Sequence, residues 1–111
     1  MPKTIKIPAD ALQVLNPNTD TALDDVGAPM PKVFHAEVVK MLFRDTRLAQ
    51  GLGVFEAFDL RKLLVDAAPG SEVVVDDEAA KVLAEVATKP AIFNTLWLTS
   101  PDVVEFLRSI A

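Results

Sequence analysis

The sequence contains one histidine, His35, whose imidazole is the side chain best suited to move protons near neutral pH. It stands at the start of a predicted helix, beside Phe34. A hydroxyl nucleophile is available in Ser100, but no histidine or lysine lies near it in the sequence to activate it. A lone histidine is more often a surface or capping residue than a catalytic one. We therefore predict a surface or capping role for His35 and a capping role for Ser100.

Three consecutive carboxylates, Asp76, Asp77 and Glu78, are of the type that binds Mg²⁺ or Ca²⁺. A calcium loop spaces its acids alternately around a central glycine, and here they are contiguous. Acids at a helix start are stabilised by the free amide groups and by the helix dipole. We therefore expect a helix N-terminus here. For the pair Asp24-Asp25 we also prefer a structural role to a metal site, and we expect a solvated turn.

Other motifs for cofactors are incomplete. Gly51-Leu52-Gly53 is half of a dinucleotide-binding fingerprint, and it lacks the third glycine and the preceding strand. There is no cysteine, which excludes disulfides and thiolate chemistry. We predict no catalytic residue, no cofactor and no metal, and a small hydrolase or metal enzyme stays as the last alternative.

The elements that position these residues are clearest in the stretch 71–86. Val73, Val74 and Val75 predict a short strand over 72–75, and the acids start a helix directly after it. The apolar stripe of that helix consists of Ala79, Val82, Leu83 and Val86.

The N-terminal third is rich in strands and loops. Lys3–Ile7 alternates polar and apolar residues, and we predict that it pairs with the strand 72–75, its lysines lying beside acids. A second extended segment is expected at 11–15, with Thr21–Leu23 as a returning hairpin arm. The segment 16–32 is dominated by turn residues.

Two helical stretches follow. The first covers 34–44, with Phe34, Val38, Met41 and Leu42 on its inner face. The second covers 46–67 after Asp45 as N-cap, with a stripe of Leu48, Leu52, Phe55 and Phe58 that changes at Asp59. We expect a kink or a new N-cap at Asp59. A close helix crossing or a local break would explain Gly51 and Gly53.

The C-terminal part holds the only tryptophan. The segment 91–98 is compatible with a strand or a helix, and Phe93 and Trp97 in it are core residues or interface anchors. Ser100 as N-cap and Pro101 at the first helical position then predict a final helix. Its apolar stripe consists of Val103, Phe106, Leu107 and Ile110.

Together these elements predict an α+β fold in a single domain of 111 residues. A small sheet, formed by the N-terminal strands and 72–75, packs against three to five helices. Residues 1–33 form the strand- and loop-rich part, and residues 34–111 are mainly helical. No apolar run is long enough for a membrane helix, and no signal peptide is recognisable. We expect a cytoplasmic or virion-associated protein.

The charge is concentrated in one region. Residues 66–85 hold six acids and one base, a balance of 1 − 6 = −5, which equals the formal charge of the whole chain. An acidic chain is disfavoured as a direct binder of nucleic acids or anionic membranes. An acidic face is instead suited to a basic protein partner.

Five segments make the layout resemble that of small accessory proteins encoded by bacteriophages and prophages: KTIKIP, VLNPNTDTAL, FRDTRLAQGL, APGSEVVVDDEAAKVL and VVEFLRSIA. The resemblance spans most of the chain and assigns no functional residue. It implies a binding role in virion assembly or in the modulation of a host.

The main functional hypothesis is a non-enzymatic interaction or assembly module that self-associates or docks on a larger protein. Half of the residues are apolar and the mean hydropathy is positive, which indicates apolar surface left for a partner. The alternative is an acidic binder or inhibitor of a nucleic-acid-handling enzyme, acting through the 66–85 face. The candidate partner-binding residues are Phe93, Trp97, Glu72, Asp76, Asp77, Glu78 and Glu85.

Overall fold

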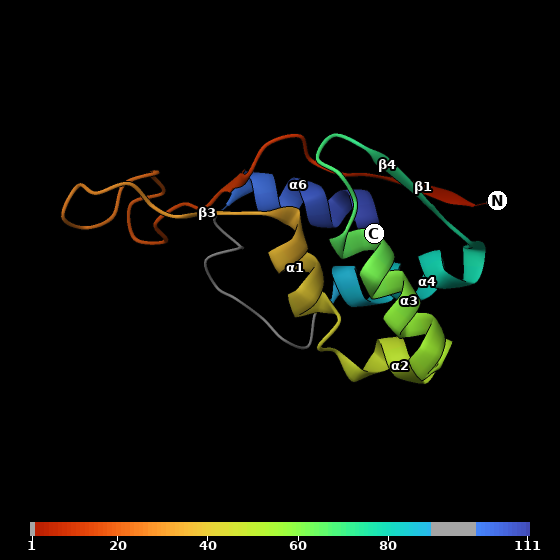
Figure 1. Cartoon of the computed structure of the whole chain (residues 1–111). Helices are drawn as coiled ribbons and strands as arrows, with labels where there is room; N and C mark the ends of the chain where they lie inside the picture. The colour runs from red at the N-terminus through yellow and green to blue at the C-terminus, as the bar shows by residue number, and fades with distance from the viewer. Residues whose placement is uncertain (1, 90–99) are drawn as a thin grey trace.

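A computed structural model of the chain describes residues 2–89 and 100–111, and over these it has the predicted α+β fold (Figure 1). The described strands form two separate antiparallel pairs. The strands are β1 (Lys3–Lys6), β2 (Leu12–Gln13), β3 (Lys32–Val33) and β4 (Glu72–Val75). The helices are α1 (His35–Leu42), α2 (Thr46–Leu52), α3 (Val54–Val65), α4 (Asp77–Thr88) and α6 (Pro101–Ile110).

The predicted pairing of the first strand with 72–75 is confirmed. Strand β1 runs antiparallel to β4, with Lys6 opposite Glu72 and Ile5 opposite Val73. The alternation of the two strands places Ile5, Val73 and Val75 in the core and leaves Lys6 and Glu72 exposed. One face of the pair is therefore buried against the helices.

The second extended segment is also present, but its partner differs from the expectation. Strand β2 pairs with β3, so that Leu12 lies opposite Val33, and the predicted return arm at 21–23 is wrong. Leu23 instead forms an isolated bridge with Pro29 inside the connection between β2 and β3. This connection projects away from the helices (Figure 1).

Helix α4 begins as predicted. Asp76 is its N-cap, and a carboxylate oxygen accepts a hydrogen bond of 2.8 Å from the amide of Ala79. The buried side of the helix includes Leu83 and Val86, which are fully excluded from solvent. Helix α4 packs against both α2 and α6, so the cap sets the start of the central helix of the core.

Helix α6 also begins at the predicted residue. Its stripe is confirmed, with Val103, Phe106 and Ile110 buried and Leu107 partly buried. Ser100 occupies the N-cap position but makes no capping bond within the helix. Its hydroxyl accepts a hydrogen bond of 3.0 Å from the amide of Leu15, which ties the chain after β2 to the helix.

The long helical segment breaks at Gly53, which confirms the local break expected at the glycines, and α3 continues through Asp59, so the new N-cap expected there is wrong. Gly53 has φ 87° and ψ 158°, a conformation that is strained for any residue with a Cβ atom. The new helix direction buries Leu60 and Leu64 and exposes Phe55 and Phe58, which the sequence placed on the inner stripe. Phe34 is exposed as well, because α1 starts after it.

Gly51 marks a close helix crossing. A Cβ atom at this position would lie 2.9 Å from Cγ2 of Val82 in α4. Valine is stiff about χ1 and cannot turn away easily. The two glycines thus have different roles: Gly51 lets α2 approach α4, and Gly53 ends α2.

We expect Gly51→Ala to lower the free energy of unfolding by about 1 kcal/mol, because overpacking of about 1–3 kcal/mol exceeds the gain in helix propensity of about 1 kcal/mol. In a Val82→Ala background the clash disappears, and the same change should stabilise the protein by up to about 1 kcal/mol. Urea unfolding of the four proteins of this cycle measures both effects. The same effect of Gly51→Ala in both backgrounds would contradict the close crossing.

Candidate interaction groove between helix α3 and strand β4

His35 is part of the core. It is 8% exposed, and its ring meets that of Phe106 edge to face, with centroids 6.3 Å apart. Its Nε2 atom donates a hydrogen bond of 3.2 Å to the carbonyl oxygen of Leu64. That carbonyl belongs to the last turn of α3, where helix carbonyls lack partners within the helix. His35 therefore joins α1 to the end of α3.

The acids at the start of α4 occupy its N-cap and its first turn. In the described parts of the chain, no three His, Asp or Glu side chains lie close enough together to hold a metal ion. Asp76 is occupied as the N-cap, and Asp77 and Glu78 follow in the first turn of the helix. Their arrangement agrees with stabilisation of a helix N-terminus.

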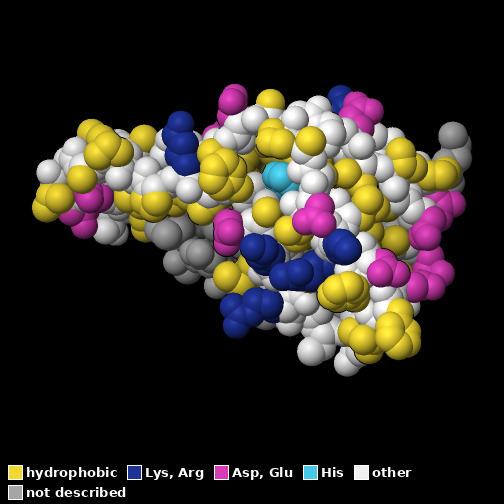
Figure 2. Space-filling model, viewed as in Figure 1, with side chains coloured by type: hydrophobic (Ala, Val, Ile, Leu, Met, Phe, Trp, Pro, Cys, Tyr) yellow, Lys and Arg dark blue, Asp and Glu magenta, His cyan; other side chains and the backbone are white. Residues whose placement is uncertain are grey.

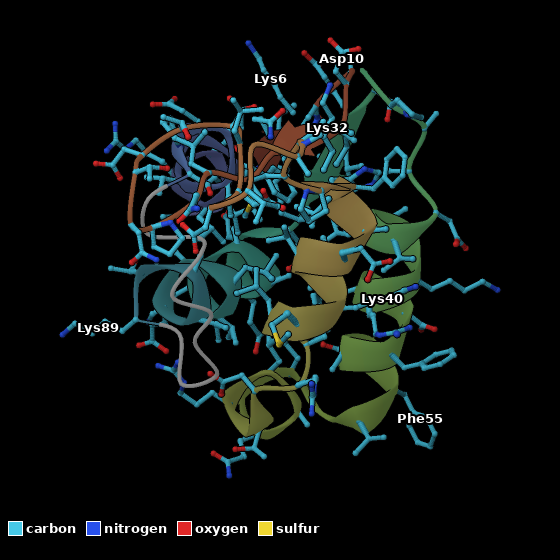
Figure 3. All side chains as sticks on the ribbon, turned by 90° about the vertical axis from the view of Figure 1, so that its left-hand side faces the viewer. Lys6, Asp10, Lys32, Lys40, Phe55 and Lys89 are labelled. Carbon is cyan, nitrogen blue, oxygen red and sulfur yellow. The ribbon has the colours of Figure 1, made fainter. Side chains whose placement is uncertain are left out.

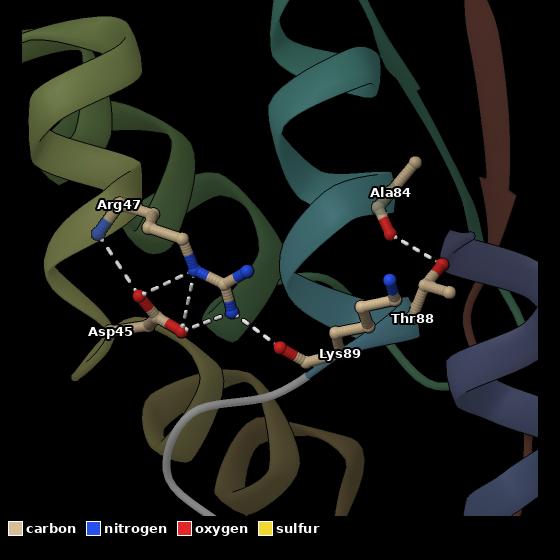
Figure 4. A network of polar contacts seen from close by, with 5 residues as sticks. All are labelled: Asp45, Arg47, Ala84, Thr88 and Lys89. Atoms are coloured by element: carbon tan, nitrogen blue, oxygen red, sulfur yellow. Dashed lines mark hydrogen bonds and ion pairs between the residues drawn. The ribbon is translucent and has the colours of Figure 1, made fainter.

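A polar network that the sequence analysis missed connects α2 to the end of α4 (Figure 4). The buried carboxylate of Asp45 accepts hydrogen bonds from the amide and the guanidinium of Arg47, the shortest being 2.7 Å. Arg47 also donates to the carbonyl oxygen of Lys89. The hydrogen bond to Asp45 is the main cause that raises the pKa of Arg47, and the charge of Glu85 adds to it.

A groove runs between α3 and β4. It consists of two hollows of about 350 and 520 Å³ that share Asp59 and Leu63. The first half of α3 faces the end of β4, and the second half faces its start. The groove therefore follows the full length of the strand.

Apolar side chains on both sides of the groove are open to solvent. Leu63 of α3 is 50% exposed and Val74 of β4 is 62% exposed. Leu60 and Ala79 line the deeper part and are buried. The groove thus offers an apolar floor between two exposed apolar side chains.

Carboxylates surround this floor. Glu56, Asp59, Asp66 and Glu72 line the groove, and among the described residues none of these four forms an ion pair. The only cationic side chain in the lining is Lys62. Figure 2 shows the acidic side chains gathered on the side of the molecule where β4 ends and α4 begins.

The structure brings together only part of the predicted acidic set. Glu72 and Asp76 line the groove. Asp77 and Glu78 do not line it, and Glu85 lies with Arg47 and Lys89 on another side of α4. Phe93 and Trp97, like the whole of the ambiguous segment 91–98, lie outside the described residues.

Glu56 and Asp59 are acidic groove residues that lie outside the predicted 66–85 face and that sequence reasoning missed. Their spacing of three residues places them on one side of a helix, and Leu63 follows four residues after Asp59 on the same side. This pattern was a usable signal. It was hidden because Phe55 and Phe58 were assigned to the inner face.

A second exposed apolar surface lies where α2 meets α3. This apolar corner consists of Val54, Phe55 and Phe58, of which Phe55 is 85% exposed and Phe58 61%. Figure 3 shows Phe55 pointing away from the helices into solvent. Large aromatic side chains exposed together are typical of interaction surfaces.

Comparison of the chain with protein-family models, with curated proteins and with solved structures found no match. Among the described helices, none has the length and apolar character needed to cross a membrane.

For His35, we expect replacement by phenylalanine to lower the free energy of unfolding by about 1–3 kcal/mol, because the buried carbonyl of Leu64 loses its donor. His35→Gln keeps an N–H donor and should lose less. Denaturant unfolding of both variants measures the difference. Equal stability of His35→Phe and the wild type would contradict the structural role of the imidazole.

Proposed function

We propose that this protein is a non-enzymatic interaction module that binds a basic segment of another protein in the groove between α3 and β4. The observation that carries the proposal is the combination of exposed Leu63 and Val74 with four carboxylates that have no ion-pair partner among the described residues. The apolar pair supplies area to bury, and the acids select a cationic partner.

The positions of the titratable side chains support binding over catalysis. His35 is held in the core by Leu64 and Phe106 and does not line the groove. The carboxylates are exposed and spread along the groove. A general acid or base instead works from a partly buried position beside the reacting group.

The carboxylates around the groove also determine how the affinity for a basic segment should depend on salt concentration. Exposed ion pairs contribute about 0.2–1 kcal/mol each, and salt screens them. Several weak pairs around one apolar floor would give an affinity that falls steeply with ionic strength. In this proposal the acidic surface of the chain acts through the groove and not through the whole 66–85 region.

The resemblance to phage accessory proteins is consistent with this role. A small acidic module could attach to a basic surface of a virion component or of a host enzyme that handles nucleic acids. Proteins that bind nucleic acids carry lysine- and arginine-rich surfaces, and a basic segment of either partner class would suit the groove.

We expect a labelled peptide of four Lys-Val repeats to bind the protein, and a peptide of four Glu-Val repeats not to bind. Binding should weaken strongly between about 0.1 M and about 1 M salt, where the screening length falls from about 10 Å to about 3 Å. Fluorescence anisotropy measures both. Failure of the Lys-Val peptide to bind at low salt would contradict the proposal.

The chain offers a matched control for the site. Asp59→Asn with Glu72→Gln removes two charges from the groove, and we expect the affinity to fall by about 2- to 30-fold. Glu78→Gln with Glu85→Gln removes two charges from the 66–85 region outside the groove, and it should change the affinity less than twofold. Equal losses from the two double variants would indicate non-specific attraction to an acidic protein.

Self-association is a second candidate function, favoured by the apolar corner of Val54, Phe55 and Phe58. None of these three residues lines the groove. A second copy of the chain offers the same apolar side chains, as an isologous dimer requires.

We expect light scattering to give a mass above the 12.0 kDa of one chain at high protein concentration. Phe55→Ser with Phe58→Ser should restore the monomer mass, because it removes the aromatic contact area. Phe34→Ser, which changes an exposed phenylalanine elsewhere, should leave the mass unchanged. A wild-type protein that stays monomeric at all concentrations would remove this candidate.

A further inference from the structure

Over residues 2–89 and 100–111, strand β4 has one strand neighbour. The described sheet consists of β1 and β4, so each of these strands has one edge without a described partner strand. The amide of Ile7 donates a hydrogen bond of 2.8 Å to the carbonyl of Ser71, which places these opposed residues at a hydrogen-bonded position of the ladder, although the amide of Ser71 itself donates to Ala68. In an antiparallel ladder such pairs alternate with non-bonded ones, so Val73 and Val75 also direct their backbone groups to β1.

The remaining β4 residues, Glu72 and Val74, direct their backbone N–H and C=O groups to the opposite edge. No hydrogen bond from another described residue reaches these groups. Both residues line the groove beside α3. The groove therefore contains a strand edge with two free donors and two free acceptors, beside an apolar floor.

The free edge of β1 is different, because it has the features that prevent strand pairing. Prolines precede and follow the strand at positions 2 and 8, and both Lys3 and Lys6 are in it. Lys3 also donates a 2.6 Å hydrogen bond to the carbonyl of Ile110 at the end of α6. Strand β4 has neither lysine nor proline, and its exposed residues are a valine and a glutamate.

We propose that the partner binds by strand addition: an extended segment with alternating basic and apolar residues pairs with the free edge of β4 and lies in the α3–β4 groove. This inference rests on the proposed function and adds the binding mode and the sequence pattern of the ligand. Backbone hydrogen bonds would supply affinity, and alternate side chains would supply specificity.

The alternation of basic and apolar residues in the ligand follows from the two faces of the added strand. Side chains on its inner face meet Leu60 and Leu63 and must be apolar. Side chains on its outer face lie beside Glu72 and Val74 and near the groove carboxylates Asp59 and Asp66, so lysine or arginine is favoured there. A second copy of β4 is a poor occupant, because it would bring the Glu72 carboxylates and the groove carboxylates of the two copies together.

The experiment uses the Lys-Val repeat peptide with backbone N-methyl groups on one alternate set of residues. In a strand, residues with side chains on one face direct their N–H groups to one edge. Methylation of the set that faces β4 should lower the affinity more than about tenfold, since it blocks two hydrogen bonds. Methylation of the other set should change it less than about threefold. If the peptide pairs antiparallel to β4, methylation of its lysine residues should weaken binding. If it pairs parallel to β4, methylation of its valine residues should do so.

Variants of the protein test the β4 edge independently of changes in the peptide. Val74→Pro removes an outward N–H group, and edge strands tolerate proline at such positions. It should lower the affinity for the unmodified peptide about tenfold or more, whereas Val74→Thr, which keeps the N–H group, should retain most of it. Thr4→Pro removes the corresponding group from the free edge of β1 and is the matched control, with no expected loss. Amide exchange should show protection of Glu72 and Val74 on addition of the peptide.

Equal effects of the two methylation patterns, or no protection of Glu72 and Val74, would overturn strand addition. If the unmodified peptide still binds in a salt-dependent way, the proposed function stands and only the binding mode is wrong. If the unmodified peptide does not bind, the proposed function fails first. A complex in which a second copy occupies the β4 edge would also overturn the inference.

Discussion

The pairing of β1 with β4 is the contact on which the rest of the structure depends. It joins residues at the start of the chain to residues about two-thirds along it, and it buries Ile5, Val73 and Val75 on one face. Helix α4 starts directly after β4, with Asp76 as its cap. The position of the strand pair therefore fixes where the central helix enters the core, and α2 and α6 pack against that helix.

In a sheet of two strands, neither strand is flanked by a neighbour on both sides, as the inner strands of a larger sheet are. In the part of the chain that the structure describes, β1 and β4 are both edge strands, and the backbone groups of each edge need a partner, solvent or protection. In β1 the edge is protected by lysines and prolines. In β4 the edge opens into a groove whose other wall is α3. The small sheet is thus what leaves the edge of β4 open for the strand addition that we propose.

Local signals in the sequence predicted most elements but not all of their faces. The cap at Asp76, the start at Pro101 and the alternation of Lys3–Ile7 depend on neighbouring residues only, and all three are confirmed. The inner face of α3 depends on where Gly53 turns the chain, so the periodicity through Phe55 and Phe58 gave the wrong face. Of the acidic candidates, only Glu72 and Asp76 lie in the groove, because the others are on sides of α4 that turn away from it.

The sequence by itself determined the fold class, the order of the main elements, the strand pair and the acidic character of the surface, since these follow from residue periodicity, caps and charge. Only the tertiary structure decided that His35 contacts Leu64 and Phe106, that Glu56 and Asp59 join Glu72, and that β4 and α3 line one groove. These relations depend on the direction in which each helix leaves its turn. That direction is set by the packing of distant segments, which no local pattern of residues encodes.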